Sequence, residues 1–204
     1  KYREAFFVPF ARLIDHVALY PTPGNHDVIS EGGAPYDAAF HLPEARPFPG
    51  SRSYSFDWGD AHFVSIDDSL TTPDEATLAW LEADLAASSA RWRIAFAHRP
   101  YMSDSSQHAD DPGLRAALEP IFERTGVALF LAGHVHNYER FHPVSGVTCV
   151  ISGGGGRLHS VEPSARLAAS ARLLHFLTLD VDGSRIRLRA LRETGDLIDE
   201  ATLE

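Results

Sequence analysis

The chain has 204 residues, of which 44% are hydrophobic and 23% are charged, a composition typical of a globular protein rather than a disordered one. A formal net charge of -10, from 28 acidic and 18 basic residues, argues against nonspecific attraction to nucleic acid or to an anionic membrane surface. No apolar run approaches the roughly 18 residues of a membrane span, and the single cysteine, Cys149, excludes an internal disulfide and is expected to be a small buried residue.

The first quarter of the chain predicts few regular elements. Residues 2–14 carry apolar side chains at helical spacing, but Pro9 forbids an uninterrupted helix, so we expect a broken one. Residues 17–20 predict a short strand that ends at a Pro-Gly loop. Residues 29–52 are rich in Gly, Pro and Ala and predict a long loop, a kind of segment that is often functional.

From residue 53 onward, strands and helices alternate. Residues 53–58 and 62–67 predict an antiparallel hairpin. A helix is then expected with Thr72 as its N-cap and Pro73 in its first position, and a second helix from Pro112, ending at Gly126. Further strands are expected at residues 92–97, 127–132 and 148–152, and a hairpin at residues 176–181 and 185–191. This order predicts an α/β sandwich with a mixed sheet, in a single domain of residues 1–204.

Polar groups follow three of the predicted strands. They are Asn25-His26-Asp27 after residues 17–20, His98 after residues 92–97, and His134 and His136 after residues 127–132. Ligands gather at the carboxyl ends of strands in open α/β sheets, so these side chains are expected to converge if the strands are neighbours. In the irregular turn that Gly133 permits, the two following histidines can point toward neighbouring ions.

An asparagine oxygen together with several imidazoles suits a borderline divalent ion such as zinc, manganese or iron(II), and suits calcium poorly. A lone histidine near a strand end is more often a hydrogen-bonded structural residue, so His98 gains its interest from the other clusters. The remaining histidines lack such a context and are expected on the surface or in the core: His16, His41, His62, His142, His159 and His175. Four consecutive glycines, residues 153–156, are not followed by Lys-Ser/Thr, which excludes a P-loop and favours a tight turn beside the site.

The sequence resembles the purple acid phosphatase branch of the calcineurin-like metallophosphoesterases over nearly its whole length. The motifs that carry the resemblance are Pro23-Gly24-Asn25-His26-Asp27, His98-Arg99-Pro100-Tyr101, and Gly133-His134-Val135-His136-Asn137-Tyr138-Glu139-Arg140. The resemblance implies a mixed-sheet α/β/β/α sandwich and a binuclear centre of two transition metal ions, iron, zinc or manganese. It implies that Asn25, His98 and His134 hold one ion and that His136 holds the second.

The resemblance also implies a reaction, the hydrolysis of a phosphate ester by a metal-bound hydroxide. His26, beside Asp27, would give a proton to the leaving oxygen. His108 resembles a family position that contacts the phosphate, and Arg99 and Arg140 are weaker candidates for the same task. The expected partner is a small phosphorylated substrate, with no nucleic acid and no membrane.

One part of the family pattern has no match before Asn25. Family members carry an Asp-x-His motif and a Gly-Asp block there, with a tyrosine ligand in the purple enzymes, and these supply most ligands of the second ion. We therefore expect an N-terminally truncated sequence that lacks the first strands of the sheet and that, alone, holds one ion and is weak or inactive. Two alternatives remain open: a phosphodiesterase or nucleotidase of the same superfamily, and a catalytically impaired metal-binding fragment. Because the family is often exported, a periplasmic or extracellular location is expected.

Overall fold

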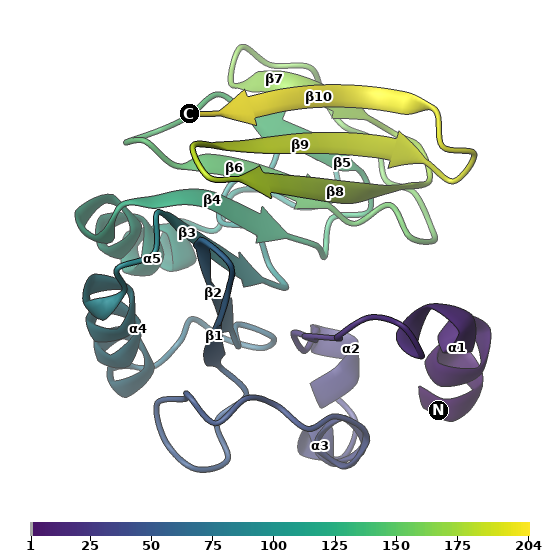
Figure 1. The fold of residues 1–204 in the computed structure, drawn as a ribbon. Helices are drawn as coiled ribbons and strands as arrows, with labels where there is room; N and C mark the ends of the chain where they lie inside the picture. Colours follow the sequence, from purple (N-terminus) through teal and green to yellow (C-terminus); the bar gives the residue numbers. More distant parts are fainter. Residues whose placement is uncertain (1) are drawn as a thin grey trace.

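A seven-stranded mixed sheet with strand order β1-β2-β3-β4-β6-β5-β7 organises the chain in the computed structural model, which describes residues 2–204. Its strands are β1 (Tyr54–Trp58), β2 (Ala61–Ile66), β3 (Trp92–Ala97), β4 (Val127–Ala132), β5 (Tyr138–Phe141), β6 (Thr148–Ser152) and β7 (Leu167–Ala171). Helices α4 (Glu75–Ala87) and α5 (Pro112–Thr125) cover one face. A three-stranded antiparallel sheet of β8 (His175–Asp182), β9 (Arg185–Arg192) and β10 (Leu197–Leu203) covers the other, as Figure 1 shows.

The centre of the large sheet is parallel. Strand β2 pairs in parallel with β3, β3 with β4, and β4 with β6. Their carboxyl ends therefore lie along one edge, where the loops that follow β3, β4 and β6 meet. This arrangement confirms the predicted α/β class with a mixed sheet.

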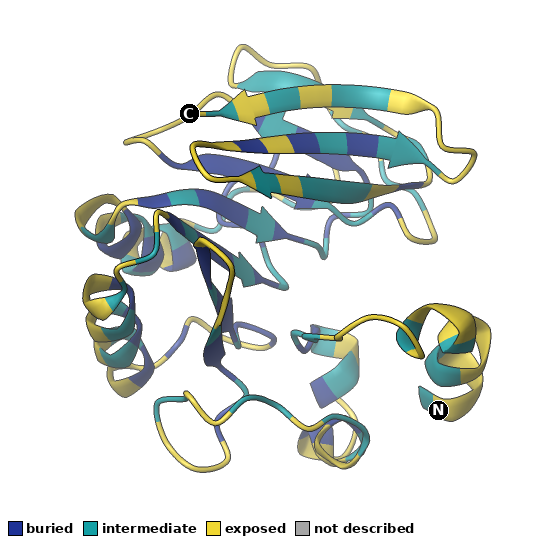
Figure 2. Cartoon of the chain, viewed as in Figure 1, coloured by how far each residue is buried: buried dark blue, intermediate teal, exposed yellow. Residues whose placement is uncertain are grey.

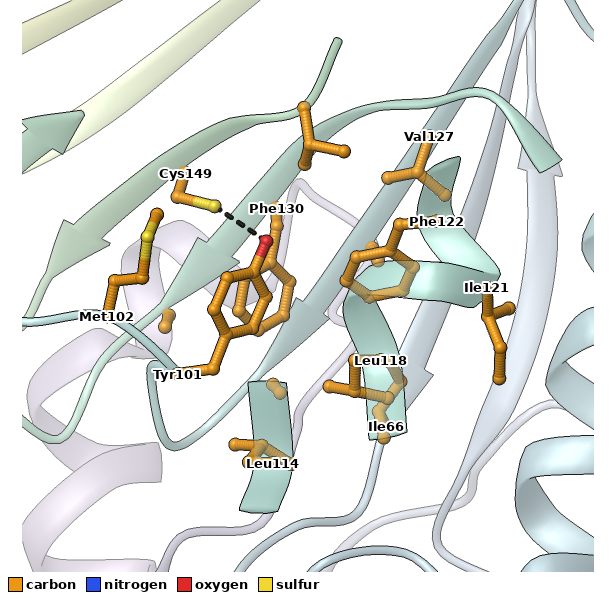
Figure 3. Packing of buried hydrophobic residues seen from close by; sticks show 14 of the residues in the cluster. Ile66, Tyr101, Met102, Leu114, Leu118, Ile121, Phe122, Val127, Phe130 and Cys149 are labelled. Carbon is orange, nitrogen blue, oxygen red and sulfur yellow. Dashed lines mark hydrogen bonds between the residues drawn. The ribbon is translucent and has the colours of Figure 1, made fainter. Parts of the chain in front are cut away.

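A core of apolar side chains fills the space between the large sheet and helices α4 and α5. Figure 3 shows Tyr101 packed among the apolar side chains of this core, with its hydroxyl 2.9 Å from the sulfur of Cys149. Tyr101 also stacks on Phe130 of β4, with ring centroids 5.0 Å apart. Burial raises the pKa of the Cys149 thiol to about 12, so this cysteine is an inert core residue, as expected.

A second core joins the two sheets. Ile94 and Leu129 of the large sheet pack with Ile186 and Leu188 of the small one, and all four side chains are fully buried. In Figure 2 these inner surfaces are the darkest parts of the strands, whereas α1 (Val8–Ile14) is largely exposed. The carboxyl edge of the large sheet is thus held rigidly from both faces.

The two long helices follow the predicted pattern, with one correction. Helix α5 begins after Asp111, whose carboxylate accepts the amide hydrogen of Leu114, and ends at Gly126 with a φ of 70°. Helix α4 was expected to be capped by Thr72, which is wrong. Asp74 caps it instead: its carboxylate accepts the backbone amide of Thr77 at 2.8 Å. Thr77 is three residues further on, in the first turn, where backbone amides have no partner within the helix.

The N-terminal quarter departs further from the predictions. The broken helix is confirmed, as a π-helical turn (Arg3–Phe7) followed by α1 with Pro9 near its start. The strand expected at residues 17–20 is absent, since that segment has no regular secondary structure and pairs with none of the strands among residues 2–204. The expected loop 29–52 contains a short helix, α3 (Ala34–Ala39). Figure 1 shows α1, α2 (Asn25–Val28) and α3 grouped apart from α4 and α5.

Three strands were not predicted from the sequence. Strand β5 begins inside the histidine motif, β7 lies between the glycine run and the predicted hairpin, and β10 completes the small sheet. The hairpins β1–β2 and β8–β9 are confirmed, the latter turning through Gly183 with a φ of 46°.

His62 joins the first hairpin to helix α4 through two carboxylates. Its side chain is 7% exposed, with Nδ1 2.8 Å from Asp57 and Nε2 2.9 Å from Asp84. Both ring nitrogens must carry protons to donate to two carboxylates, so this geometry favours the imidazolium ion. The hydrogen bond to Asp84 and that to Asp57 raise the pKa of His62, against the opposing effect of burial.

This linkage predicts that the stability contributed by His62 depends on pH. Because its pKa is raised on folding, the contribution is complete below the ordinary value of about 6.5 and is lost as pH rises through the folded-state value. We expect His62→Gln to lower the free energy of unfolding by about 1–3 kcal/mol at pH 6 and by less at pH 9. Denaturant unfolding at both pH values measures this, with His142→Gln at an exposed position as the control. An equal loss at the two pH values would show that His62 is neutral in the folded protein.

Candidate functional site

Three polar atoms meet at the carboxyl edge of the large sheet. The Oδ1 atom of Asn25 lies 2.9 Å from Nε2 of His98, and that same nitrogen lies 3.0 Å from Nδ1 of His134. His98 follows β3, His134 follows β4, and Asn25 begins the short helix α2. The structure therefore brings together three of the residues that the sequence motifs singled out.

The turn after β4 aims His134 at His98. The amide of Val135 donates to the carbonyl of Gly133 at 2.6 Å, which closes a three-residue turn around His134, whose φ is 60°. A positive φ at a residue with a side chain costs roughly 1–2 kcal/mol, and such strain is concentrated at functional sites. The expectation that Gly133 supplies the unusual backbone is wrong, because His134 itself adopts it.

Both imidazoles of this group are held neutral. Burial lowers the pKa of His98 to about 4, although the carboxylate of Asp27 opposes the shift. Burial, together with the neighbouring His98 and His108, lowers the pKa of His134 to about 4. Neutral imidazoles keep a lone pair on one nitrogen, which is the form that binds a metal ion.

The fully buried Asp68, which the sequence motifs did not reveal, fixes the loop that carries His98. Its carboxylate accepts the backbone amides of His98 at 3.0 Å and of Arg99 at 2.9 Å. Burial raises the pKa of Asp68 to about 7, against these amides and the Arg99 charge. The sequence could have revealed Asp68 by its position directly after the predicted strand 62–67, because β2 ends at the same edge of the sheet as β3.

Close packing at Gly24 brings Asn25 to His98. A Cβ atom on Gly24 would lie 2.8 Å from Cε1 of the His98 ring, which is closer than real Cβ contacts allow. Asp27 fixes the same turn, by accepting the Gly24 amide at 2.9 Å and the Tyr2 hydroxyl at 2.5 Å. His26, which lies between Asn25 and Asp27 in the chain, is exposed on α2.

His136 points to a different neighbour from His134. Its ring stacks on His159, with centroids 4.4 Å apart and planes 17° apart, and its Nδ1 is buried without a hydrogen-bond partner among the described residues. His159, which was expected on the surface or in the core, is partly exposed and lies against His136. His16, His41 and His142 are exposed and His62 and His175 are buried, as expected.

The three predicted substrate-binding residues have different surroundings. The ring of His108 lies 4.4 Å from that of His134, so it belongs to the histidine cluster. Arg99 donates to Asp111 at 2.9 Å and to the carbonyl of Asp68 at 2.7 Å. Arg140 makes two bonds to Asp199 of β10, at 2.7 and 3.0 Å. These contacts give both arginines a structural task, and a role in substrate binding stays a prediction for them.

The donor set fits one transition metal ion. Ligand atoms at right angles around an ion with bonds of about 2.1 Å are about 3 Å apart, which matches the two distances that join Asn25, His98 and His134. Among residues 2–204 no group of three or more His, Cys, Asp or Glu side chains is placed to hold an ion, so the amide oxygen of Asn25 is needed as third donor. For a second ion, the candidate donor among the residues that the motifs singled out is Nδ1 of His136, which has no hydrogen-bond partner among residues 2–204.

Two relatives from Arabidopsis thaliana are similar in sequence. Purple acid phosphatase 21 is 32% identical over 153 residues, covering 66% of this chain and 35% of that protein. Probable inactive purple acid phosphatase 9 is 33% identical over 152 residues, covering 66% of this chain and 23% of that protein. The chain thus spans well under half the length of these curated relatives.

A solved structure shares the fold. The purple acid phosphatase PPD1 from yellow lupin (Lupinus luteus) seeds superposes with a TM-score of 0.76 at 24% identity, over 88% of this chain and 37% of that chain. The model of the calcineurin-like phosphoesterase family matches residues 2–138, two thirds of the sequence. That match includes Asn25, His98, His134 and His136, and with it the chain belongs to the calcineurin-like phosphoesterase family.

Proposed function

We propose that this chain carries the metal-binding and acid–base side chains of a metal-dependent phosphoric ester hydrolase, of the acid-phosphatase type that acts on phosphomonoesters. The observation that supports this most strongly is the meeting of Asn25 Oδ1, His98 Nε2 and His134 Nδ1 at separations of 2.9 and 3.0 Å. Three neutral donor atoms this close together, with two of them on buried imidazoles, match what a preformed metal site requires.

In this proposal Asn25, His98 and His134 hold one ion and His136 contributes to a second, with iron, zinc or manganese as the candidates. Ions bound there supply positive charge for the phosphate oxygens and lower the pKa of bound water. The chain's own residues orient that centre: Asp68 holds the His98 loop, and the turn at His134 directs its ring inward. His136 keeps its unpartnered Nδ1 available.

His26 is the proposed general acid, which gives its proton to the leaving oxygen of the ester. The one-turn helix α2 fixes its backbone beside Asn25, and Asp27 stabilises that turn through Gly24. His108, 4.4 Å from His134 between ring centroids, is placed to contact the phosphate. The proton donor and the phosphate contact thus flank the candidate metal ligands.

Two other functions remain candidates for specific reasons. A phosphodiesterase or nucleotidase would use the same donor set, and a panel of monoester, diester and nucleotide substrates distinguishes them. A catalytically impaired metal-binding protein is favoured by the single donor at the second position and by the likeness to a relative named as probably inactive. Retention of His26 beside Asp27 argues for catalysis, because a purely structural site needs no acid.

The proposed partner is a small phosphorylated molecule, and the proposed location is periplasmic or extracellular. None of the described helices is long and apolar enough to cross a membrane.

The first prediction concerns metal affinity. Gly24→Ala places a methyl group 2.8 Å from the His98 ring, so His98 must move away from Asn25. Displacing a metal ligand or its support typically costs about 10- to 100-fold in affinity, which titration calorimetry with Zn²⁺ or Mn²⁺ measures. Gly155→Ala is the matched control, since nothing lies within 4 Å of its Cβ. Equal affinities of the two variants would remove Gly24 and His98 from the site.

The second prediction concerns the acid. His26→Ala should lower kcat for an alkyl phosphate by about 10²–10⁴-fold, the usual contribution of a general acid, with the metal content unchanged. For nitrophenyl phosphate the loss should be smaller, because nitrophenolate leaves without a proton. His16→Ala, an exposed histidine on the preceding segment, should behave as the wild type. An alkyl phosphatase rate that survives the His26 substitution would refute its assignment as the acid.

A further inference from the structure

Two histidines outside the candidate ligand set cover the two histidines of the motif. His108 lies over His134, with ring centroids 4.4 Å apart and planes 56° apart. His159 stacks on His136 at 4.4 Å, and His108 and His159 are 5.4 Å apart. The four imidazoles therefore form one chain of ring contacts, from His134 through His108 and His159 to His136.

Hydrogen bonds fix which nitrogen of His159 carries a proton. The backbone amide of His136 donates to Nδ1 of His159 at 3.4 Å, and the amide of His159 donates to the carbonyl of His136 at 2.8 Å. A ring nitrogen that accepts a hydrogen bond has no proton, so the hydrogen of this imidazole is on Nε2. The Nε2–H group lies across the ring from the backbone of His136 and is a donor for a ligand.

Glycines bring the backbone of this loop to the edge of the sheet. A Cβ atom on Gly153 would lie 2.1 Å from the carbonyl oxygen of Val135, and one on Gly154 would lie 2.1 Å from Nδ1 of His175. Only glycine allows these approaches. Gly153 brings the start of the loop after β6 against the turn that holds His134 and His136, and Gly154 brings it against His175. His159 itself is fixed to this turn by the bond from its amide to the His136 carbonyl.

The loops of His108 and His159 are also tied to each other. Ser105 and Val161 form an antiparallel bridge, and the amide of Glu162 donates to the carbonyl of Asp104 at 2.7 Å. Arg166 pairs with the carboxylates of Asp104 and Asp110.

A buried carboxylate anchors this pair of loops to the motif itself. Glu139 is fully buried, accepts the Asp104 amide at 2.7 Å, and accepts the side-chain amide of Asn137 at 2.8 Å. Hydrogen bonds thus connect the loops of His108 and His159 to the motif that contains His134 and His136.

Positive charge surrounds His159 in a chain that is acidic overall. Two exposed arginines lie near it: Arg157 is two residues before His159 in the chain, and Arg172 is the other, and both add to the effects of burial, His136 and His108 that lower the pKa of His159. An anion that approaches the cluster therefore meets a favourable local field despite the net charge of -10.

We infer that His159 is a further phosphate-binding residue, which donates its Nε2–H group to an oxygen of the substrate phosphate on the His136 side of the site. His108 occupies the opposite, His134 side. This inference rests on the phosphoesterase function proposed above, and it assigns a direct substrate contact to a residue that none of the family motifs contains.

Two variants separate a hydrogen-bond donor from a stacking partner. His159→Phe keeps a flat ring against His136 but removes the donor, whereas His159→Gln keeps an N–H group at similar reach and loses the ring. We expect His159→Phe to weaken binding of inorganic phosphate to the Mn²⁺-loaded protein by about tenfold, and His159→Gln to stay within about threefold of the wild type. His142→Phe, at an exposed histidine outside the cluster, is the control.

Calorimetry with phosphate and metal analysis by mass spectrometry give the readouts. Weaker phosphate binding by His159→Phe with unchanged metal content supports the inference, and in the active protein KM should rise more than kcat falls. Unchanged phosphate binding overturns it. Loss of metal from His159→Gln but not from His159→Phe also overturns it, because His159 then serves only to orient His136. If the metal-loaded wild type itself binds no phosphate, the proposed function fails together with the inference.

Discussion

Ala97 and Ala132 are paired in register at the ends of two parallel strands, and the site depends on this pairing. It makes His98 and Gly133 the next residues on neighbouring strands, where the Gly133 amide donates to the His98 carbonyl at 3.0 Å. His134 then needs only one tight turn to face His98. The cores on both faces of the sheet keep these two strand ends fixed, so the donor atoms are preorganised before any ligand arrives.

The edge of the sheet explains the rest of the site by the same rule. Strands β2, β3, β4 and β6 all end there, and the loop after each of them carries a histidine of the cluster or a residue that positions one. Asp68 follows β2 and fixes the His98 loop, while the glycine run follows β6 and leads to His159. Asn25 is the exception, because it comes from a separate short helix. It can lie close to His98 because Gly24, the residue before it, has no side chain to push the His98 ring away.

Much of this arrangement could be predicted from the sequence, because it follows from strong local signals. The buried face of α5 follows from the helical spacing of Leu114, Leu118 and Phe122. His98 and His134 were identified because each is a polar residue close behind an apolar run. Other features depend on partners that are distant in sequence. Residues 17–20 have the composition of a strand but no neighbour to pair with, and β10 exists because β9 offers it an edge.

Other contacts that the sequence did not reveal show the same limit. Thr72 and Asp74 are both good N-caps, and only the packing of Leu81 and Leu85 decides where α4 begins. His98 comes directly after a strand, whereas the glycine run separates His159 from the end of β6. The position of His159 at the same edge of the sheet is therefore not evident from the sequence. Arg140 sits in a catalytic-looking motif, yet its partner Asp199 lies on a strand that the sequence did not reveal.

The central claim is that Asn25, His98 and His134 form a metal site in the folded chain. Anomalous diffraction from crystals of the protein grown with Mn²⁺ or Zn²⁺ tests it most directly. The account predicts an anomalous peak within bonding distance of Asn25 Oδ1, His98 Nε2 and His134 Nδ1. A metal bound elsewhere, for example between His62 and Asp84, with these three atoms left in contact only with one another, would contradict it.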